Sequence, residues 1–175
     1  MTFIDGELAG TTRVNLGADE NAILPSLSVY PDLIEPQLRE GRVIVEFTRL
    51  AARLDFSSAY PELAYMIMRP AYLAAEHFDA EIAIASPRAE HVAFYRRVFR
   101  GVQWCEPRDY PGLTAKFACM GADFRAMQHG IEARYPFYRS TTAEREALFG
   151  AFGAVADAAS SAARARPSFE TLATA

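Results

Sequence analysis

The chain has 175 residues, of which 51% are hydrophobic and 12% aromatic, and 22 acidic residues exceed 18 basic ones. This length suits one domain with its own core, and the composition excludes a disordered polar chain. No apolar run reaches the roughly 18 residues that cross a bilayer, and the first residues do not form a signal peptide. Two cysteines, Cys105 and Cys119, make neither a metal quartet nor a disulfide framework. We therefore expect a protein of the reducing cytoplasm.

Arginine supplies every basic residue except Lys116. A guanidinium pairs in a planar geometry with carboxylate or phosphate, so this bias is compatible with anion recognition. Alanine is abundant as well, and the two together also fit the codon usage of a GC-rich genome. The net charge of −4 excludes a broad nucleic-acid surface.

The first half of the chain alternates strand and helix signals. A hairpin is predicted at residues 3–16 around Asp5-Gly6, followed by a loop at 17–31 and a short helix at 31–38 that Pro36 breaks or bends. A buried strand is predicted at 43–50, with its even-numbered and odd-numbered side chains on opposite faces. A helix follows at 63–78, and we expect a kink or a non-helical turn at Pro70.

The second half continues the same pattern. We predict a strand at 81–85, a helix at 88–99, a strand at 102–105, a loop at 106–112 and a strand at 115–120. Asp123 caps a helix that runs to about Arg134. An Ala-rich helix at 143–165 precedes a frayed end. This order predicts an α/β sandwich with a partly parallel sheet that has antiparallel ends.

Few residues carry an independent chemical signal. No Gly-rich phosphate loop or dinucleotide fingerprint is present, and the three histidines lie too far apart to predict a metal site. Glu46 and Arg49 are charges in a strand that otherwise favours burial, which is costly unless they are paired or functional. Residues three apart on a regular strand face opposite sides, so we expect Arg13 to be the partner of Glu46. Function and structural ion pairing remain equal alternatives.

A second candidate begins where the strand at 81–85 ends. Ser86-Pro87 turns the chain into a helix whose first turn holds unpaired amides, and Arg88 and His91 lie at this end. An anionic group or a phosphopantetheine arm would suit this position. Tyr95 lies one turn further, on the apolar face, where a tyrosine is either core or catalyst.

Four segments together resemble the N-acyl amino acid synthases, the FeeM-like branch of the GNAT acyltransferase superfamily, which is related to the acyl-homoserine lactone synthases. They are LAGTTR at 8–13, VEFTRL at 45–50, PRAEHVAFYRR at 87–97 and RDYPG at 108–112. The resemblance covers about residues 6–138. It implies a GNAT-like mixed sheet flanked by helices, to which the sequence adds an Ala-rich C-terminal helix.

The resemblance implies a bacterial N-acyltransferase that moves a fatty acyl group from an acyl-carrier-protein thioester to the α-amine of an amino acid. By position, Glu46 would be the base, directly or through water, and Tyr95 would protonate the departing thiolate. Arg13 and Arg49 would hold Glu46 or the carboxylate of the acceptor. An amide of the strand at 43–50 would hold the oxyanion.

For the donor, the resemblance implies acyl-phosphopantetheine or acyl-coenzyme A as a substrate and no resident cofactor. Arg88 and His91 would contact it. Coenzyme A-dependent members of the superfamily have a Gly-rich loop where residues 51–60 of this chain contain no glycine, which favours a carrier protein. After Tyr95 the family runs into Leu-Gly-Phe, whereas this chain has Val98-Phe99-Arg100-Gly101.

The family also places a strand and one or two helices before the hairpin. We therefore expect that the start was assigned late or that this is a reduced form, with the transferase domain at 1–140 and a helical tail at 141–175. Two alternatives remain. One is a non-catalytic GNAT-like module that binds an acyl chain or a partner, including a second copy of itself; the other is an acyl-homoserine lactone synthase-like enzyme that uses S-adenosylmethionine.

Overall fold

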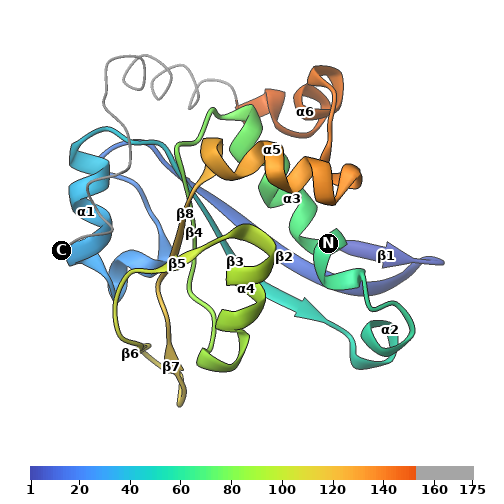
Figure 1. Ribbon diagram of the computed structural model, residues 1–175, viewed down its shortest axis with the longest axis horizontal. Coiled ribbons are helices and arrows are strands. Elements are labelled where there is room, and N and C mark those ends of the chain that lie inside the picture. Colours follow the sequence, from blue (N-terminus) through green and yellow to red (C-terminus); the bar gives the residue numbers. More distant parts are fainter. Residues whose placement is uncertain (153–175) are drawn as a thin grey trace.

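A computed structural model of the protein describes residues 1–152. Its centre is a six-stranded sheet in the order β1-β2-β3-β4-β8-β5, with helices on both faces (Figure 1). The strands are β1 (Thr2–Ile4), β2 (Glu7–Gly17), β3 (Ile44–Ala52), β4 (Ile82–Ala85), β5 (Val102–Gln103) and β8 (Met120–Asp123), and a separate ribbon pairs β6 (Arg108–Asp109) with β7 (Lys116–Phe117). The mixed α/β class predicted from the sequence is confirmed.

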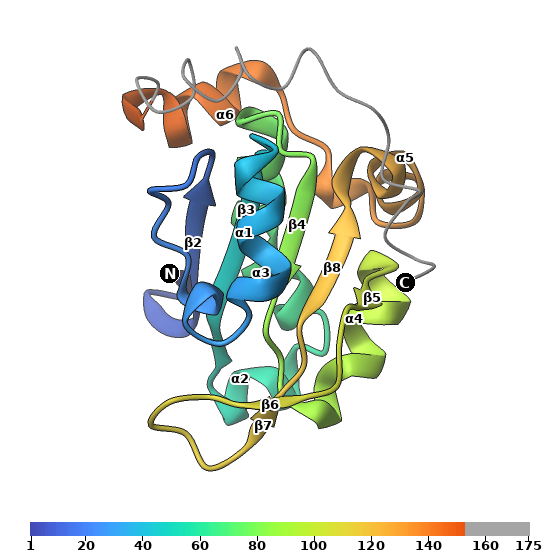
Figure 2. The ribbon, with the colours of Figure 1, turned by 90° about the vertical axis from the view of Figure 1, so that its left-hand side faces the viewer.

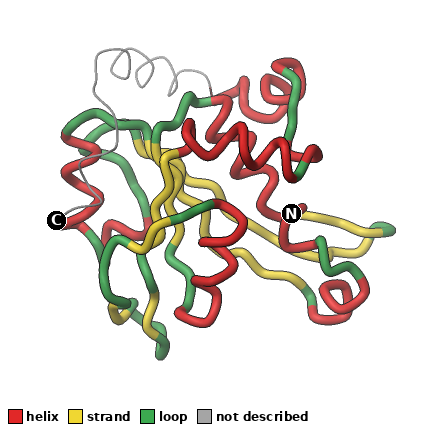
Figure 3. Tube along the Cα trace, in the orientation of Figure 1, coloured by secondary structure: helices red, strands yellow, loops and turns green. Residues whose placement is uncertain are grey.

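Helices and short 3₁₀ turns connect these strands (Figure 3). The helices are α1 (Pro31–Arg39), α2 (Leu54–Ala59), α3 (Leu63–His77), α4 (Val92–Phe99), α5 (Phe124–Arg134) and α6 (Thr142–Phe149). The 3₁₀ turns are η1 (Pro25–Ser28), η2 (Ala89–His91), η3 (Pro136–Tyr138) and η4 (Gly150–Phe152). Within residues 1–152, no helix combines the length and the apolar character that crossing a membrane requires.

The hairpin of β1 and β2 forms where Asp5-Gly6 predicts it. Both turn residues have positive φ, 49° for Asp5 and 83° for Gly6, which the two-residue turns of twisted hairpins require. The sheet is antiparallel except between β3 and β4, which are parallel and are joined by α2 and α3. The expected mixture of parallel centre and antiparallel ends is therefore confirmed.

The two faces of the sheet are covered by different helices, as Figure 2 shows: α1 lies on one face and α3 on the other. Ile44 and Ile84 pack in the cluster that contains the side chains of α1. Val45 and Ala83 pack in the larger cluster with α3, α4 and α5. The expected alternation of even-numbered and odd-numbered side chains is therefore correct for this part of β3, and it places Glu46 on the sheet face that α1 covers.

Both internal prolines lie within continuous helices. Pro36 is inside α1 and Pro70 is inside α3, so the predicted break and non-helical turn do not form. Each proline removes one backbone hydrogen bond. Residues next to Pro70, such as Met68 and Tyr72, are buried against the sheet, and this packing outweighs the lost bond.

The other differences from the predicted elements lie in connections. The predicted loop at 17–31 contains η1, and the helix predicted from residue 88 starts with the 3₁₀ turn η2 before α4. The predicted loop at 106–112 contains β6, and β5 ends at Gln103. These segments are stabilised by contacts with distant parts of the chain, which local patterns do not report.

The predicted strand at 115–120 is two strands, β7 and β8, separated by Ala118-Cys119. Ala118 donates its N–H to the carbonyl of Pro87, and the carbonyl of Cys119 accepts from Trp104, so the backbone changes partners at this point. Asp123 caps α5 as predicted, accepting a hydrogen bond from the amide of Ala126.

The helix predicted at 143–165 is described only in part. Its first residues form α6 and the turn η4, and residues 153–175 lie outside the described part of the chain. Two ion pairs hold α6 against α3: Arg69 with Glu144 at 2.6 Å, and Arg145 with Glu76 at 2.8 Å. The division of the chain at residue 140 stays a prediction.

Candidate active site

A groove opens where the two parallel strands diverge. β3 pairs with β4 only as far as Glu46 and Ile84. Beyond this point β3 continues to Ala52, whereas the segment after β4 turns away through Ser86 and Pro87. The groove has a volume of about 960 Å³. Residues 47–50 of β3 line one wall, residues 86–88 line another, and Tyr110 of the β6–β7 hairpin contributes to a third.

A β-bulge shapes the β3 wall. Thr48 pairs with Arg13 and Ala51 with Thr11, so two residues of β3, Arg49 and Leu50, lie opposite one residue of β2. Arg49 has a φ of 54°, a left-handed conformation that only strong local constraints impose on a side chain of this size. Regular pairing runs from Glu46 to Thr48, and the bulge begins at Arg49. Glu46 and Arg49 form no side-by-side pair, as expected. Arg49 is exposed and lines the groove.

Glu46 lies behind the groove rather than in its wall. Its side chain is 0% exposed, and its carboxylate accepts hydrogen bonds from Ser26 of η1: 2.7 Å from Oγ to Oε1, and 3.1 and 3.4 Å from the amide to the two oxygens. Burial raises the pKa of Glu46, and the bonds from Ser26 offset part of this effect. A carboxylate with a raised pKa and few donors is a suitable proton acceptor.

The expected partner of Glu46, Arg13, does not touch it. Within residues 1–152 Glu46 forms no ion pair, and Arg13 lowers its pKa only through charge at longer range. Arg13 is exposed and lines the groove. A serine therefore occupies the position beside Glu46 for which an arginine was predicted, and Arg13 is left available to the groove.

Two serines that the sequence did not single out complete this region. The hydroxyl of Ser26 lies 2.5 Å from the hydroxyl of Ser86, which lines the groove. Ser26 lies in a segment predicted as a loop, and Ser86 was noted only as part of a turn. They are 60 residues apart in the chain, and no local pattern relates them.

Tyr95 of α4 lies on the opposite face of the sheet from Glu46. Its side chain is 8% exposed, and its ring stacks on Phe47, with ring centres 5.8 Å apart and planes at 15°. Burial raises the pKa of Tyr95 to about 12, so its phenol keeps its proton at neutral pH. Tyr95 lines the groove and also contributes to the apolar core.

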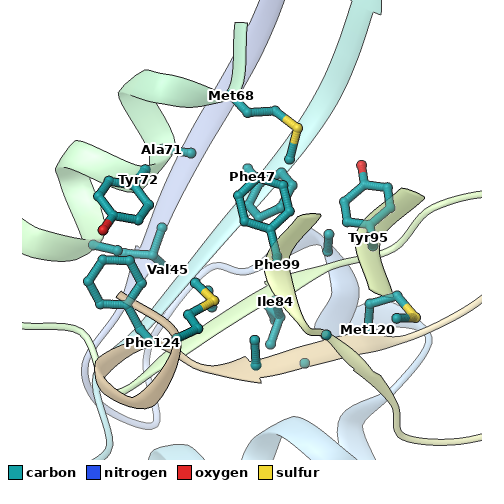
Figure 4. Close-up of a pocket in the computed structure, with 17 residues that line it drawn as sticks. Val45, Phe47, Met68, Ala71, Tyr72, Ile84, Tyr95, Phe99, Met120 and Phe124 are labelled. Atoms are coloured by element: carbon teal, nitrogen blue, oxygen red, sulfur yellow. The ribbon is translucent and has the colours of Figure 1, made fainter. Parts of the chain in front are cut away.

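A small apolar cavity adjoins the groove. Figure 4 shows Phe47, Tyr95 and Phe99 beside one another at this cavity, with Met68, Tyr72 and Met120 around them. Its volume is about 30 Å³, and its lining comes from β3, α3, α4, β4, β8 and α5. Phe47 and Tyr95 line both spaces, so these two rings separate the groove from the cavity.

The polar part of the groove lining is basic. Arg13, Arg49, Arg88 and His91 line it, and no acidic residue is found among the described residues of its wall. This arrangement favours an anion such as a carboxylate or a phosphate. Among residues 1–152, no group of three or more His, Cys, Asp or Glu side chains is arranged to hold a metal ion.

The β6–β7 hairpin is fastened to α1 beside the groove. Arg108 binds Asp32 at 2.6 and 2.7 Å and the carbonyl of Val29 at 3.1 Å, and its guanidinium lies 5.2 Å from the ring centre of Tyr30. This anchoring positions Tyr110. Burial raises the pKa of Tyr110, and the nearby charge of Glu46 adds to the effect.

A mixed sheet whose central parallel strands diverge around an apolar and basic groove defines the GNAT-like acyltransferase class. The family model of the N-acyl amino acid synthase FeeM matches residues 1–123, and the chain belongs to this family. The protein is therefore an N-acyltransferase. The family resemblance and the enzyme class expected from the sequence are confirmed.

Solved structures support the same fold. FeeM, an N-acyl amino acid synthase from uncultured soil microbes, is similar with a TM-score of 0.64 and 17% identity, covering 73% of this chain and 72% of that one. MesI, a CoA-dependent acyl-homoserine lactone synthase, is similar with a TM-score of 0.52 and 17% identity, covering 79% of this chain and 67% of that one. A comparison with curated protein sequences finds no match.

Proposed function

We propose that this N-acyltransferase moves a fatty acyl group from an acyl-carrier-protein thioester to the α-amine of an amino acid. The observation that carries the proposal is one groove that combines basic side chains, apolar side chains and a buried carboxylate behind its wall. An amino acid brings a carboxylate and an amine, and an acyl thioester brings a long apolar chain. The groove offers complementary surfaces for all three.

The acceptor binds at the wall formed by β2 and β3. Arg13 and Arg49 extend from neighbouring strands into the groove, and their forked guanidinium groups suit the planar carboxylate of an amino acid. When the carboxylate of the acceptor is held there, its amine points toward Ser86 and Glu46. Glu46 acts as the general base, because a raised pKa brings a carboxylate closer to the working pH.

The donor lies along the opposite wall. Arg88 and His91 line the outer groove, where they contact the phosphate of the phosphopantetheine arm. The acyl chain lies in the groove against its apolar side chains, among them Phe47 and Tyr95. Pairing between β3 and β4 stops at Glu46. Backbone amides of β3 after Glu46 that point toward the groove therefore form no hydrogen bond with β4 and can hold the oxyanion.

Tyr95 acts on the leaving group. Its phenol stays protonated at neutral pH and donates to the sulfur of the departing thiolate. Tyr95 and Glu46 lie on opposite faces of the sheet, so the groove between β3 and β4 lets one group serve the amine while the other serves the thioester.

A carrier-protein donor is favoured by the segment that follows β3. In place of a glycine loop, α2 holds Asp55 in its first turn, and Arg53 is paired with Asp55 and with Glu7 at 3.0 Å. A carboxylate at this position repels a pyrophosphate. Acyl-coenzyme A is the second candidate donor, because MesI is described as CoA-dependent.

The test is a transfer assay with purified protein. Acyl-carrier thioesters and acyl-coenzyme A are supplied separately with a mixture of the twenty amino acids and S-adenosylmethionine, and products are identified by mass spectrometry. An N-acyl amino acid formed faster from the carrier thioester is the expected result. A lactone product would favour the acyl-homoserine lactone alternative, and no acyl amide from either donor would contradict the proposal.

The remaining expectations are part of the same proposal. The transferase unit is residues 1–140, the tail is 141–175, and the enzyme works in the bacterial cytoplasm with acyl carrier protein as its partner. Light scattering of the full chain tests whether it forms a homodimer.

A further inference from the structure

We propose that Ser26 and Ser86 form a proton relay that connects the buried carboxylate of Glu46 with the acceptor amine in the groove. This inference deepens the proposed function and rests on it. It assigns a role to two hydroxyl groups that the family resemblance did not identify.

The first argument is access. Glu46 is 0% exposed and does not line the groove, so an amine in the groove has no direct contact with the carboxylate. Ser26 is also 0% exposed, whereas Ser86 is partly exposed and lines the groove. The oxygen atoms form a continuous chain, with 2.7 Å from Glu46 to Ser26 and 2.5 Å from Ser26 to Ser86.

The second argument is the direction of the hydrogen bonds. A serine hydroxyl has one proton and can accept further bonds. Ser26 donates its proton to the ionised Glu46, so in the bond between the two serines Ser86 must be the donor. The Ser86 oxygen therefore keeps its accepting lone pairs for the groove, where the acceptor amine lies.

The proton transfer balances along this chain. An ammonium proton of the acceptor passes to Ser86 Oγ, the Ser86 proton passes to Ser26 Oγ, and the Ser26 proton passes to Glu46 Oε1. The neutral amine then forms the N–C bond at the thioester carbonyl and the C–S bond breaks. The departing sulfur receives the proton of Tyr95, and the second nitrogen proton restores the Tyr95 phenol. Protonated Glu46 returns its proton through the same chain in reverse, and one proton is released to solvent per turnover.

The protein holds both ends of the relay in place. Ser26 is fixed by its amide, which donates to the carboxylate of Glu46, and Ser86 directly follows β4, whose Ile84 pairs with Glu46. The charged and titratable groups around Glu46 are Arg13 from β2, Tyr110 from the β6–β7 hairpin and the buried thiol of Cys119.

The first experiment measures acyl transfer by the full chain and its variants over a range of pH. Ser86→Ala removes the link at the groove, and we expect a fall in kcat of about 10²-fold with little change in KM, because the proton path is lost but the binding groups remain. Ser86→Thr keeps a hydroxyl and should restore most of the rate. Ser26→Ala should give the same loss.

Ser140 provides a matched control. Ser140 donates a 2.7 Å hydrogen bond to Glu76, the same distance as in the pair of Ser26 and Glu46, and it lies outside the groove. Ser140→Ala should retain the wild-type kcat and pH profile. Wild-type kcat and an unchanged pH profile in Ser86→Ala would overturn the relay.

A second measurement does not depend on activity. In protein carrying ¹³C-labelled glutamate carboxyl groups, NMR titration reports the protonation of Glu46, which Glu46→Gln identifies. Ser26→Ala should raise the pKa of Glu46, Ser86→Ala should raise it by less, and Ser140→Ala should leave it unchanged. An unaltered Glu46 titration in both Ser26→Ala and Ser86→Ala would overturn the relay even if the wild type transferred no acyl group. Absence of transfer together with a shifted Glu46 titration in these variants would contradict the proposed function alone.

Discussion

Arg108 and Asp32 form a two-pronged ion pair, with 2.6 and 2.7 Å between the guanidinium nitrogens and the carboxylate oxygens. The pair joins residues 76 apart in the chain and fastens the β6–β7 hairpin to α1. It also lowers the pKa of Asp32, chiefly through the hydrogen bonds from Arg108. Because Tyr110 follows β6, this contact on the outside of the molecule positions a wall of the groove.

Arg108→Ala should affect the groove more than the fold. Both side chains are more than one-third exposed, so the loss of stability should stay near 1 kcal/mol or below. Tyr110 loses its anchor, and we expect KM for the acceptor to rise several-fold. The control is Arg125→Ala, which breaks a similarly exposed pair with Asp79. Equal KM values in the two variants would contradict the role of this anchor.

Glu46→Gln should change how stability depends on pH. The pKa of Glu46 in the folded protein lies above its ordinary value of 4.5. The folded state therefore binds this proton more tightly than the unfolded chain, and the resulting stability is fully present below pH 4.5 and lost as pH rises through the raised folded pKa. The variant lacks this loss, so at pH 8 it should be as stable as the wild type or more stable.

Urea unfolding at several pH values from about 3 to 8 measures this difference. Glu144→Gln provides a control whose pH dependence has the opposite sign. Arg69 lowers the pKa of Glu144, so the stability that ionised Glu144 contributes is lost as pH falls through that lowered pKa. Parallel stability curves for wild type and Glu46→Gln would refute the buried, proton-binding carboxylate. The same variant should reduce kcat by about 10²- to 10⁴-fold.

Arg49→Gly separates backbone strain from charge. Glycine tolerates the left-handed φ of 54°, so relief of about 1 kcal/mol should offset the packing that the arginine side chain provides. Loss of the guanidinium should raise KM for the acceptor by about 10- to 100-fold, the usual range for hydrogen bonds to a charged group.

Arg100→Gly is the matched control. Arg100 has a φ of 50° and the same side chain, but it does not line the groove. Both variants should unfold at a similar or higher denaturant concentration than the wild type. A similar rise of KM in both would show that Arg49 does not bind the carboxylate.

Tyr95→Phe tests the leaving-group role. The ring and its stacking on Phe47 remain, and only the hydroxyl is removed. We expect kcat to fall by about 10²-fold with an alkyl thioester and much less with a thiophenyl ester, because thiophenolate leaves without a proton. Tyr138→Phe, which removes a buried hydroxyl bonded to the carbonyl of Tyr65, should leave both rates unchanged. An equal loss with both esters would rule out proton donation.

The sequence by itself determined the elements that depend on neighbouring residues. Asp5-Gly6 makes the hairpin because its turn needs positive φ, and Asp123 caps α5 because its side chain reaches an amide three residues on. Alternation along β3 determined that Glu46 and Phe47 lie on opposite faces. Four motifs in order were enough to identify the family, since each occupies a fixed place in the fold.

The tertiary structure alone decided how the site is connected. Arg13, Arg49, Arg88, His91 and Tyr95 line one groove, whereas Glu46 lies behind it and reaches it only through two serines. The bulge at Arg49 depends on pairing with β2, which no pattern within β3 reveals. Hydrogen bonds between residues 20 and 60 positions apart leave no periodic trace in the chain, because they depend on where folding brings the ends of separate strands and turns.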